Sequence, residues 1–412
     1  MLKYKLSLSF LGEDGFMQKN VKKAKVTGSM LAIFGVASVL FSSHAGGGFA
    51  TGNQETQYYV QYGWTAPFMA VLAMIILTAT MREVIIMYNN NDCRNYKDLF
   101  CELWSPYPKL EIIWEIYYYL MVLIAVSAVI AGAAAVFQSI GVNYFIAVFI
   151  IGIVLLVFTI FGAMLVSKAA TAMTIAILVC TLTIFIVGIK AKVPEITGIL
   201  SNRTSFTPGY IKPILNTFIY AGFQSVVIPT LAGCSRPLLK NSKEATKAMV
   251  ISFIMNAVAL GLAVTMLMGW YKEIIAAGQT TLPTLYVAGQ SGNHTIYIIY
   301  NVALFLCLMS TGVTTIFGLV NRFEDHKALS FLSSKMKRRV FTACAIMVVS
   351  MLISLTGLSN IVKYGYGYCG YLGLFTIVIP FLTLGHYKNK KFAKEHPEAK
   401  WPAELNENIE NL

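Results

Sequence analysis

Charged residues are scarce in this sequence. Only 12% of its 412 residues are Asp, Glu, Lys or Arg, whereas 57% are hydrophobic. Soluble domains carry about 25% charged residues, so this deficit excludes an ordinary soluble protein and indicates a chain that crosses a membrane many times. The net charge of +13 does not indicate nucleic-acid binding, because the basic residues lie in short connections between apolar runs, where they set membrane orientation.

Catalytic and metal-binding patterns are missing as well. The seven cysteines are scattered, without the spacing of a metal site or of a disulfide framework. No Gly-Lys-Ser/Thr phosphate loop indicates an ATP-driven pump, and no nucleophile stands in a pattern with a base. The N-terminus lacks the order of a cleavable signal. We therefore expect neither an enzyme nor a resident cofactor.

Ten apolar stretches are long enough to be spanning helices, which need about 20 mostly apolar residues. They cover about residues 27–62, 64–88, 110–139, 143–162, 165–189, 210–233, 243–271, 295–320, 340–355 and 361–384. The connections carry 25 Lys and Arg on one side and 6 on the other, which predicts that both termini are cytoplasmic. The expected organisation is a cytoplasmic tail over 1–26, one transmembrane domain over 27–385 and a second cytoplasmic tail over 386–412. The abundance of Ile, Lys, Tyr and Asn suits a bacterial plasma-membrane protein from an AT-rich genome.

Three glycines interrupt the first apolar stretch. Gly46, Gly47 and Gly48 together cost roughly 3 kcal/mol of helix propensity relative to alanine, and unwound backbone at membrane depth must be buried in protein or line a cavity. The freed N–H groups and the N-terminus of the next half-helix suit the carboxylate of a solute. The alternative is a glycine-lined contact between two helices.

A second interruption occurs five helices later, around Gly222, with Pro229 following. Because five is odd, halves over about 27–190 and 210–385 would be inverted relative to each other, and paired interruptions of this kind indicate a transporter binding site. The predicted substrate residues are Gly46, Gly47, Gly48, Phe49, Thr51, Tyr220, Gly222 and Gln224.

Hydroxyl groups in the eighth stretch indicate a cation site. Ser310, Thr311, Thr314 and Thr315 offer four hydroxyls within two turns, and the first three are the predicted ligands. Hard cations such as Na⁺ prefer oxygen ligands. We expect these hydroxyls to act with His44 or with carbonyls beside it; His44 also titrates near neutral pH and suits proton coupling. The alternative is that the hydroxyls bond back to carbonyls of their own helix.

Three charged residues inside apolar stretches are candidates for coupling or gating. Glu55 follows the glycines by two turns, and a carboxylate at membrane depth indicates function; the alternative is an exposed position at the interface. Arg82 and Glu83 lie near the cytoplasmic end of the second stretch, where salt bridges of an inner gate explain them, and simple snorkelling is the favoured alternative.

The connection over about 272–293 contains the apolar segment 282–288. It is too apolar for a solvated linker and too short to span a bilayer. We expect either a re-entrant lid over the outer vestibule or an interfacial helix.

The stretch Gly46-Gly47-Gly48-Phe49-Ala50-Thr51-Gly52-Asn53-Gln54-Glu55 resembles the GAGFASGQE-like motif of the YkvI family of bacterial membrane proteins. It departs from that motif at Gly47, at Thr51 and at the extra Asn53. This family belongs to the amino acid–polyamine–organocation (APC) superfamily, so the resemblance implies an all-α, LeuT-type fold of five plus five inverted helices with helices 1 and 6 broken. It also implies a sodium site between helix 1 carbonyls and helix 8 hydroxyls.

Together these features predict a secondary active transporter. It would move a small solute, an amino acid or related organic ion, by alternating access coupled to Na⁺ or to protons. The alternative is a ligand-sensing receptor subunit that keeps the fold without flux. The expected partners are the solute and the lipid bilayer, with no nucleic acid.

Overall fold

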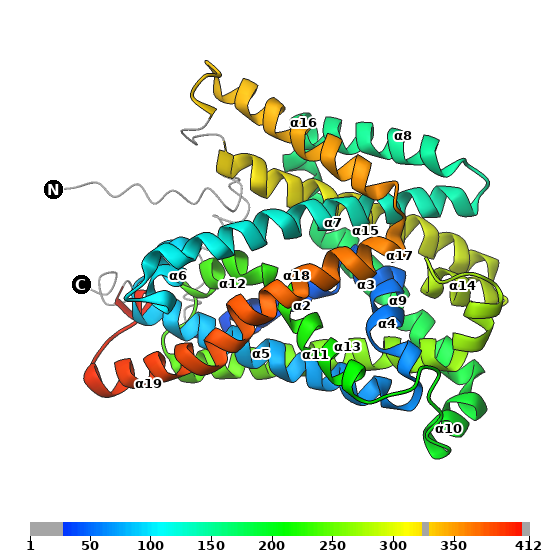
Figure 1. Cartoon of the computed structure of the whole chain (residues 1–412), viewed down its shortest axis with the longest axis horizontal. Helices are drawn as coiled ribbons and strands as arrows, with labels where there is room; N and C mark the ends of the chain where they lie inside the picture. The colour runs from blue at the N-terminus through cyan, green and yellow to red at the C-terminus, as the bar shows by residue number, and fades with distance from the viewer. Residues whose placement is uncertain (1–27, 324–328, 406–412) are drawn as a thin grey trace.

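The computed structural model describes residues 28–323 and 329–405, with the backbone alone for 162–175 (Figure 1). In that part of the chain every regular element is helical, as predicted, and short 3₁₀ or π turns join several helices. The helices are α2 (Met30–His44), α3 (Gly47–Thr51), α4 (Asn53–Tyr58), α5 (Ala66–Asn90), α6 (Tyr96–Trp104), α7 (Ile112–Ser139), α8 (Tyr144–Val157), α9 (Ala163–Ala191), α10 (Val193–Ser201), α11 (Ile211–Gln224), α12 (Ile228–Ser235), α13 (Ser242–Ala276), α14 (Pro283–Gln290), α15 (His294–Phe323), α16 (Lys335–Ser354), α17 (Leu358–Asn360), α18 (Gly367–Gly373) and α19 (His386–Glu395).

Seven helical spans in the described ranges are long and apolar enough to cross a membrane. An eighth is a pair bent by 73°, formed by the end of α9 and α10. Two predicted stretches, 27–62 and 340–355, fall short by this measure. The first is divided, so that its apolar helix α2 is only 15 residues long; the second corresponds to α16, whose first turns carry four basic residues.

The long helices pack into two groups. In one group α13 packs against α5 and α2, and α5 also packs against α11. In the other, α7 packs against α8, α15 and α16. Figure 1 shows α8 and α16 along one side of the molecule and α5 and α13 along the other, with α18 crossing between them. The helix α9 packs on both α15 and α13, and α18 packs on both α11 and α7, so these two helices connect the groups.

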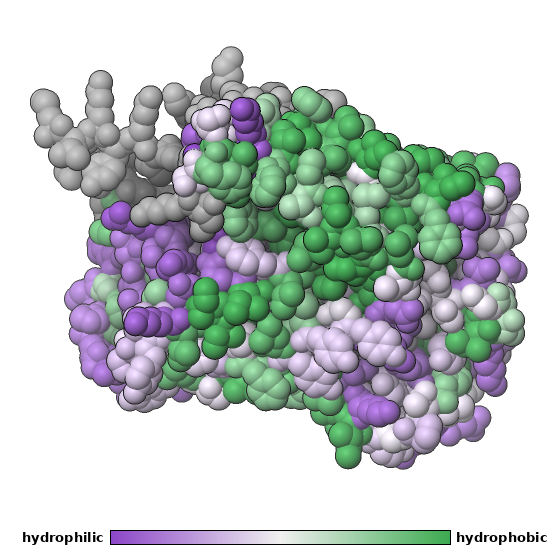
Figure 2. Space-filling model, turned by 45° about the horizontal axis from the view of Figure 1, so that its top comes forward, coloured by the Kyte–Doolittle hydropathy of each residue, from purple (hydrophilic) through white to green (hydrophobic). Residues whose placement is uncertain are grey.

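The molecule has two polar ends separated by an apolar band, which Figure 2 shows in green between purple regions. We call the end that carries α10, α14 and the connection 277–282 the lid end, and the opposite end, with α6, α12 and α19, the α19 end (Figure 1). Large apolar side chains on the band are exposed, among them Phe145 and Phe149 on α8 and Ile254 and Val258 on α13. An exposed apolar surface of this extent is that of a multi-pass membrane protein.

The residues after 385 fold onto the bundle. The Asn389 side chain of α19 donates to the Glu83 carbonyl oxygen of α5 at 3.0 Å. Further on, Trp401 is buried and its indole N–H donates to Asn90 Oδ1 at 2.8 Å. Residues 386–405, predicted to be a tail, are therefore part of the folded body at the α19 end.

Candidate substrate and ion site at the divided first helix

The first apolar stretch is divided twice. The helix α2 ends at His44, and Gly46 is extended before α3 begins. The helix α3 ends at Thr51 and is followed by Gly52, whose φ of +77° is left-handed, and α4 begins at the next residue. Gly47 and Gly48 are helical, which differs from the predicted unwinding through all three glycines. One extended and one left-handed glycine suffice to turn the chain, because these are the conformations that glycine adopts at little cost.

The glycines allow α3 to lie directly on α15. A Cβ atom at Gly47 would be 2.7 Å from Leu308 Cδ2 and 3.2 Å from Leu308 Cα. A Cβ atom at Gly46 would lie 3.6 Å from both the Ser43 carbonyl oxygen and the Thr311 hydroxyl. Gly46 and Gly48 are half-buried and Gly47 is fully buried. Gly47 therefore forms the helix contact that was the alternative to a binding role, whereas Gly46 and Gly48 retain some access.

His44 connects three helices through both ring nitrogens. Nδ1 lies 2.7 Å from Asn256 Oδ1 on α13, and Nε2 lies 2.8 Å from the Tyr220 hydroxyl on α11. The Asn256 amide in turn donates to the Ser252 carbonyl oxygen at 2.8 Å. The imidazole is buried, and one of its nitrogens must donate while the other accepts or donates according to its protonation state. Sequence reasoning missed Asn256, because its partner is 212 residues away.

Aromatic rings surround this polar chain. Phe49 lies 5.4 Å from His44 and 5.9 Å from Phe185, centroid to centroid. Tyr220 lies 5.1 Å from Tyr59 and 5.8 Å from Tyr58. The predicted residues His44, Phe49 and Tyr220 thus meet in one buried cluster between α2, α3 and α11.

The second interruption differs from the prediction. Residues 211–235 form one continuous span, and only a 3₁₀ turn at Ser225–Val227 separates α11 from α12. Gly222 lies in a close helix contact, since a Cβ atom there would be 2.2 Å from the Gly370 carbonyl oxygen of α18. The Gly222 carbonyl accepts from the Tyr117 hydroxyl at 2.7 Å. Gly222 is therefore a packing residue rather than a break, while Gln224 is half-buried at the turn.

Thr51 and Asn53 shape the joint between α3 and α4. The Thr51 hydroxyl donates to the Gly48 carbonyl oxygen at 2.7 Å and accepts from the Asn53 backbone N–H at 3.2 Å. The Asn53 amide donates to the carbonyl oxygens of Thr280 at 2.8 Å and Thr281 at 3.2 Å, and to the Ser359 hydroxyl at 3.0 Å. Asn53 thereby holds the connection before α14 and the start of α17 against the first helix.

The short helix α14, which lies in the connection predicted to be either a lid or an interfacial helix, packs on the joint. A Cβ atom at Gly52 would be 2.3 Å from the Thr284 hydroxyl, so only glycine permits this approach. On the other side of the joint the Tyr300 hydroxyl of α15 donates to the Ala50 carbonyl oxygen. Asn53, Thr284 and Glu55 are all fully buried, and the structure is closed at the lid end.

Several buried polar atoms at the joint lack hydrogen-bond partners within the described residues. They are Asn53 Oδ1, Gln54 Oε1, both carboxylate oxygens of Glu55, the Tyr59 hydroxyl and the Thr284 hydroxyl. Buried polar groups are rarely left unsatisfied in folded proteins. This concentration of unpaired oxygens makes the joint the candidate site of the described chain.

The predicted cation ligands of α15 differ in their surroundings. Thr314 is exposed, and its hydroxyl donates to the Ser310 carbonyl oxygen at 2.9 Å; this is the back-bonding alternative. Ser310 is buried. Thr311 lies against Gly46, so a hydroxyl of α15 and the Ser43 carbonyl oxygen approach the same point.

Arg82 and Glu83 lie at the α19 end, away from the joint. The Arg82 guanidinium pairs with the Glu83 carboxylate and donates to the Thr246 hydroxyl of α13 at 2.8 Å. Glu83 is also 3.2 Å from His386 Nδ1, and accepts from Asn389 at 2.8 Å. The pair therefore connects α5 to α13 and α19. Neither residue contacts the joint between α3 and α4 through these bonds.

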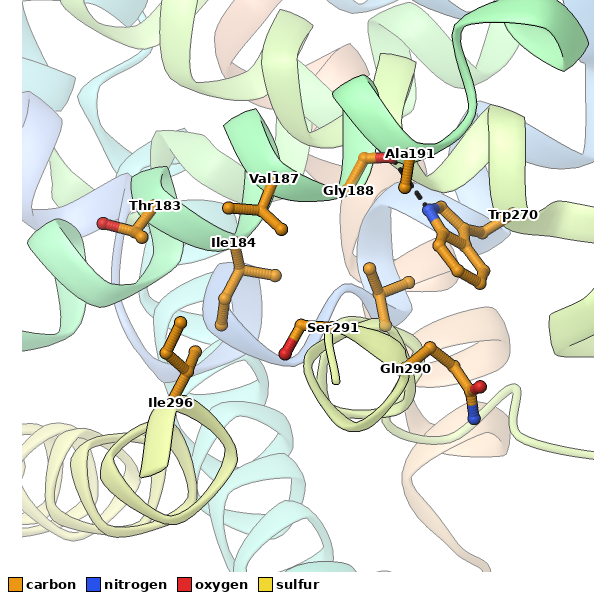
Figure 3. A pocket seen from close by; sticks show the side chains of 10 residues that line it. Thr183, Ile184, Val187, Gly188, Ala191, Trp270, Gln290, Ser291 and Ile296 are labelled. Carbon is orange, nitrogen blue, oxygen red and sulfur yellow. Dashed lines mark hydrogen bonds between the residues drawn. The ribbon is translucent and has the colours of Figure 1, made fainter. Parts of the chain in front are cut away.

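An apolar hollow opens beside the lid, between α9, α13, α14 and α15 (Figure 3). In Figure 3, Val187 and Ile184 of α9 face Ser291, and Trp270 donates through its indole N–H to the Gly188 carbonyl oxygen at 3.0 Å. None of the predicted site residues lines this hollow. It is separate from the joint.

Comparisons with known proteins bear on the fold. No family model matches the chain, and none of the curated proteins does. Among solved structures, a mutant of a manganese transporter from Eremococcus coleocola is 14% identical, with a TM-score of 0.50 over 85% of this chain and 78% of the transporter. A Na⁺-coupled sialic acid symporter in a substrate-bound outward-open state is 11% identical, with a TM-score of 0.47 over 87% and 97%.

The likeness to the manganese transporter shows that the chain has the fold of a membrane transporter. At this identity it carries no information about cargo or coupling.

Proposed function

We propose that this chain is a secondary active transporter that moves a small solute by cation-coupled alternating access. The observation that supports the proposal best is the joint between α3 and α4, which is buried in a transporter fold and surrounded by unpaired oxygens. Such an arrangement is costly for a purely structural element. It is expected where a solute or ion binds at a divided helix near the middle of a membrane.

The proposal includes a LeuT-type arrangement of ten helices in two inverted halves, in the YkvI family. In support, the structure has eight candidate spans, and the number of spans becomes ten if α2 and α16 also cross the bilayer. The division of helices into two packed groups also suits the relative motion that alternating access needs. The excess of basic residues at the α19 end favours a cytoplasmic position for that end and for both termini, with the lid end outside, in the plasma membrane of a bacterium.

We assign the solute to the joint and its aromatic cluster. The contacts would come from the half-buried Gly46 and Gly48, from Phe49 and Thr51, and from Tyr220 with Gln224. The N–H groups at the start of α3 suit a carboxylate, and the unpaired side-chain oxygens of Asn53 and Gln54 suit an ammonium group. An amino acid or related organic ion carries both. For a coupling Na⁺, Thr311 and the carbonyl oxygens near Gly46 are better placed than Thr314, with Ser310 and His44 adjacent.

The test is uptake into liposomes that contain the purified chain. A panel of radiolabelled amino acids and organic acids is offered under an inward Na⁺ gradient, an inward proton gradient, or neither. The proposal predicts that one gradient drives accumulation of at least one solute. Saturable binding without flux under any gradient would replace the transporter with the sensor, the receptor subunit that keeps the fold.

A further inference from the structure

Glu55 is the one carboxylate in the described part of the chain that is buried with both oxygens unpaired. It lies on α4, is fully buried, and neither of its oxygens has a hydrogen-bond partner. Two other carboxylates there are comparably buried, and both have a cation beside them: Glu83 pairs with Arg82, and Glu115 pairs with Arg322 of α15. The fold therefore supplies a cation where a buried carboxylate is kept charged, but not at Glu55.

Phenols lie around the joint. Tyr59 is one turn beyond Glu55 along the chain and its ring lies 5.1 Å from that of Tyr220 on α11, and the Tyr300 hydroxyl of α15 donates to the Ala50 carbonyl oxygen. The hydroxyl of Tyr59 is itself unpaired, and that of Tyr220 continues to His44. A phenol can donate a hydrogen bond but brings no positive charge.

No cation from a neighbouring element approaches Glu55 among the described residues. The elements that pack most extensively against α4 are α3, α11, α13, α14, α17 and the turns at 60–65 and 361–366. Their lysines are all exposed, namely Lys212, Lys243, Lys247, Lys272 and Lys363. The two acids of α13 are engaged elsewhere: Glu244 accepts from the Lys240 backbone N–H, and Glu273 pairs with Lys192. Tyr62, Tyr271, Tyr286, Tyr364 and Tyr366 are the remaining titratable groups of these elements, all of them phenols.

Glu55 is buried in a structure that is closed at the lid end. The connection 277–282 and α14 close over the joint through Asn53, and the Tyr300 hydroxyl closes on Ala50. An ionised carboxylate carried into this setting would lose its water without gaining a cation, which is strongly unfavourable. A neutral carboxylic acid loses far less, and its O–H becomes a donor for a nearby hydroxyl oxygen.

We propose that Glu55 binds the coupling proton, and that the lid end closes only when this carboxyl group is protonated. The proposal rests on the transporter function above and names its coupling ion. A proton from water at the lid end binds to a Glu55 carboxylate oxygen, closure buries the neutral acid, and opening at the α19 end returns the proton to water. No bond other than the O–H bond forms or breaks.

The test follows closure directly and needs no solute. Spin labels are placed on cysteines at Gln290 of α14 and Lys212 of α11, both exposed at the lid end, in a full-length chain whose native cysteines are replaced. Pulsed electron resonance then gives the population of the short, closed distance in nanodiscs from pH 5 to 9, in KCl and in NaCl. The matched controls are Glu55→Gln, which mimics the neutral acid, and Glu195→Gln, an exposed carboxylate on α10.

The closed-to-open ratio is expected to fall as the pH rises, by up to about tenfold per pH unit, and equally in both salts. Glu55→Gln should stay closed throughout, and Glu195→Gln should behave like the parent. A pH response that survives in Glu55→Gln, no pH response in the parent, or closure set by Na⁺ instead of pH would each overturn the proposal.

A second readout separates this proposal from the transporter function. For a solute found by the uptake panel, Glu55→Gln should retain exchange of internal for external solute while losing accumulation driven by a proton gradient. Loss of exchange as well would mean that Glu55 binds the solute and would overturn the proton role. A pH-driven lid without flux in the parent would refute transport while leaving the protonation of Glu55 intact.

Discussion

Replacing Asn53 with alanine should release the closure at the lid end. The two N–H groups of this amide serve three acceptors, two on the connection before α14 and one at Ser359 on α17. Two donors make at most two full hydrogen bonds, each with a net contribution of about 0.5–1.5 kcal/mol. Their loss should favour the open state by about 1–3 kcal/mol, which is roughly a 5- to 150-fold increase in the open population.

The assay is thiol modification of Thr284→Cys. Thr284 is fully buried against Gly52 in the closed structure, so its cysteine should react only when the lid moves away. With the purified chain in nanodiscs at one pH, a maleimide reagent reaches both faces, and the rate of labelling reports the open population. We expect the rate in Asn53→Ala to exceed that of the parent by the factor above.

The matched control is Asn360→Ala. Asn360 adjoins Ser359 but is exposed, and its side chain donates to the Thr356 carbonyl oxygen, in the turn just before α17, at 2.8 Å. Its replacement should leave the labelling rate unchanged. Equal rates in Asn53→Ala and the parent would show that these hydrogen bonds do not hold the lid, and the reasoning about closure would fail.

Three further substitutions test the packing. Gly222→Ala would place a methyl group 2.2 Å from a carbonyl oxygen of α18, an overpacking that costs about 1–3 kcal/mol. The melting temperature of this variant in detergent should be lower than that of the parent. The control is Gly261→Ala, because Gly261 has open space around it, and its melting temperature should not fall. Equal melting temperatures in the two variants would refute the close contact at Gly222. Gly47→Leu should abolish solute binding and uptake while membrane insertion is kept, since the side chain would strike α15, and unchanged affinity would remove the joint from the site. Arg82→Gln leaves the buried Glu83 without its guanidinium partner. The substitution should lower the free energy of unfolding by about 1–3 kcal/mol, which is measured as a lower unfolding temperature. An unaltered temperature would show that the pair does not stabilise the fold.

Hydropathy predicted most of the helices because a bilayer requires long apolar runs whatever their partners. The stretch 64–88 corresponds to α5 at 66–90, and 243–271 lies within α13 at 242–276. Hydropathy could not show how the first stretch divides. Three adjacent glycines predicted one unwound segment, but the chain turns at Gly46 and Gly52 instead, because tertiary contacts with Leu308 and Thr284 decide which glycines must lack a side chain.

The candidate site was predictable in its residue types but not in its partners. His44 and Tyr220 are polar groups beside glycines in apolar stretches, and the structure brings them to 2.8 Å. Asn256 and Asn53 carry no comparable local signal, since their partners lie more than 200 residues away. The prediction of a break at Gly222 was wrong for a related reason. A single glycine in a helix permits either a bend or the close approach of another helix, and only the position of α18 shows that Gly222 permits a close approach.

The measurement that tests the central claim most directly is solute flux in liposomes, with the parent chain beside Gly47→Leu and the solute panel offered under Na⁺ and proton gradients. The account predicts that the parent accumulates a solute above its external concentration, that a protonophore abolishes the accumulation, and that Gly47→Leu shows none. Binding of a panel solute by the parent, with no flux under either gradient, would contradict it.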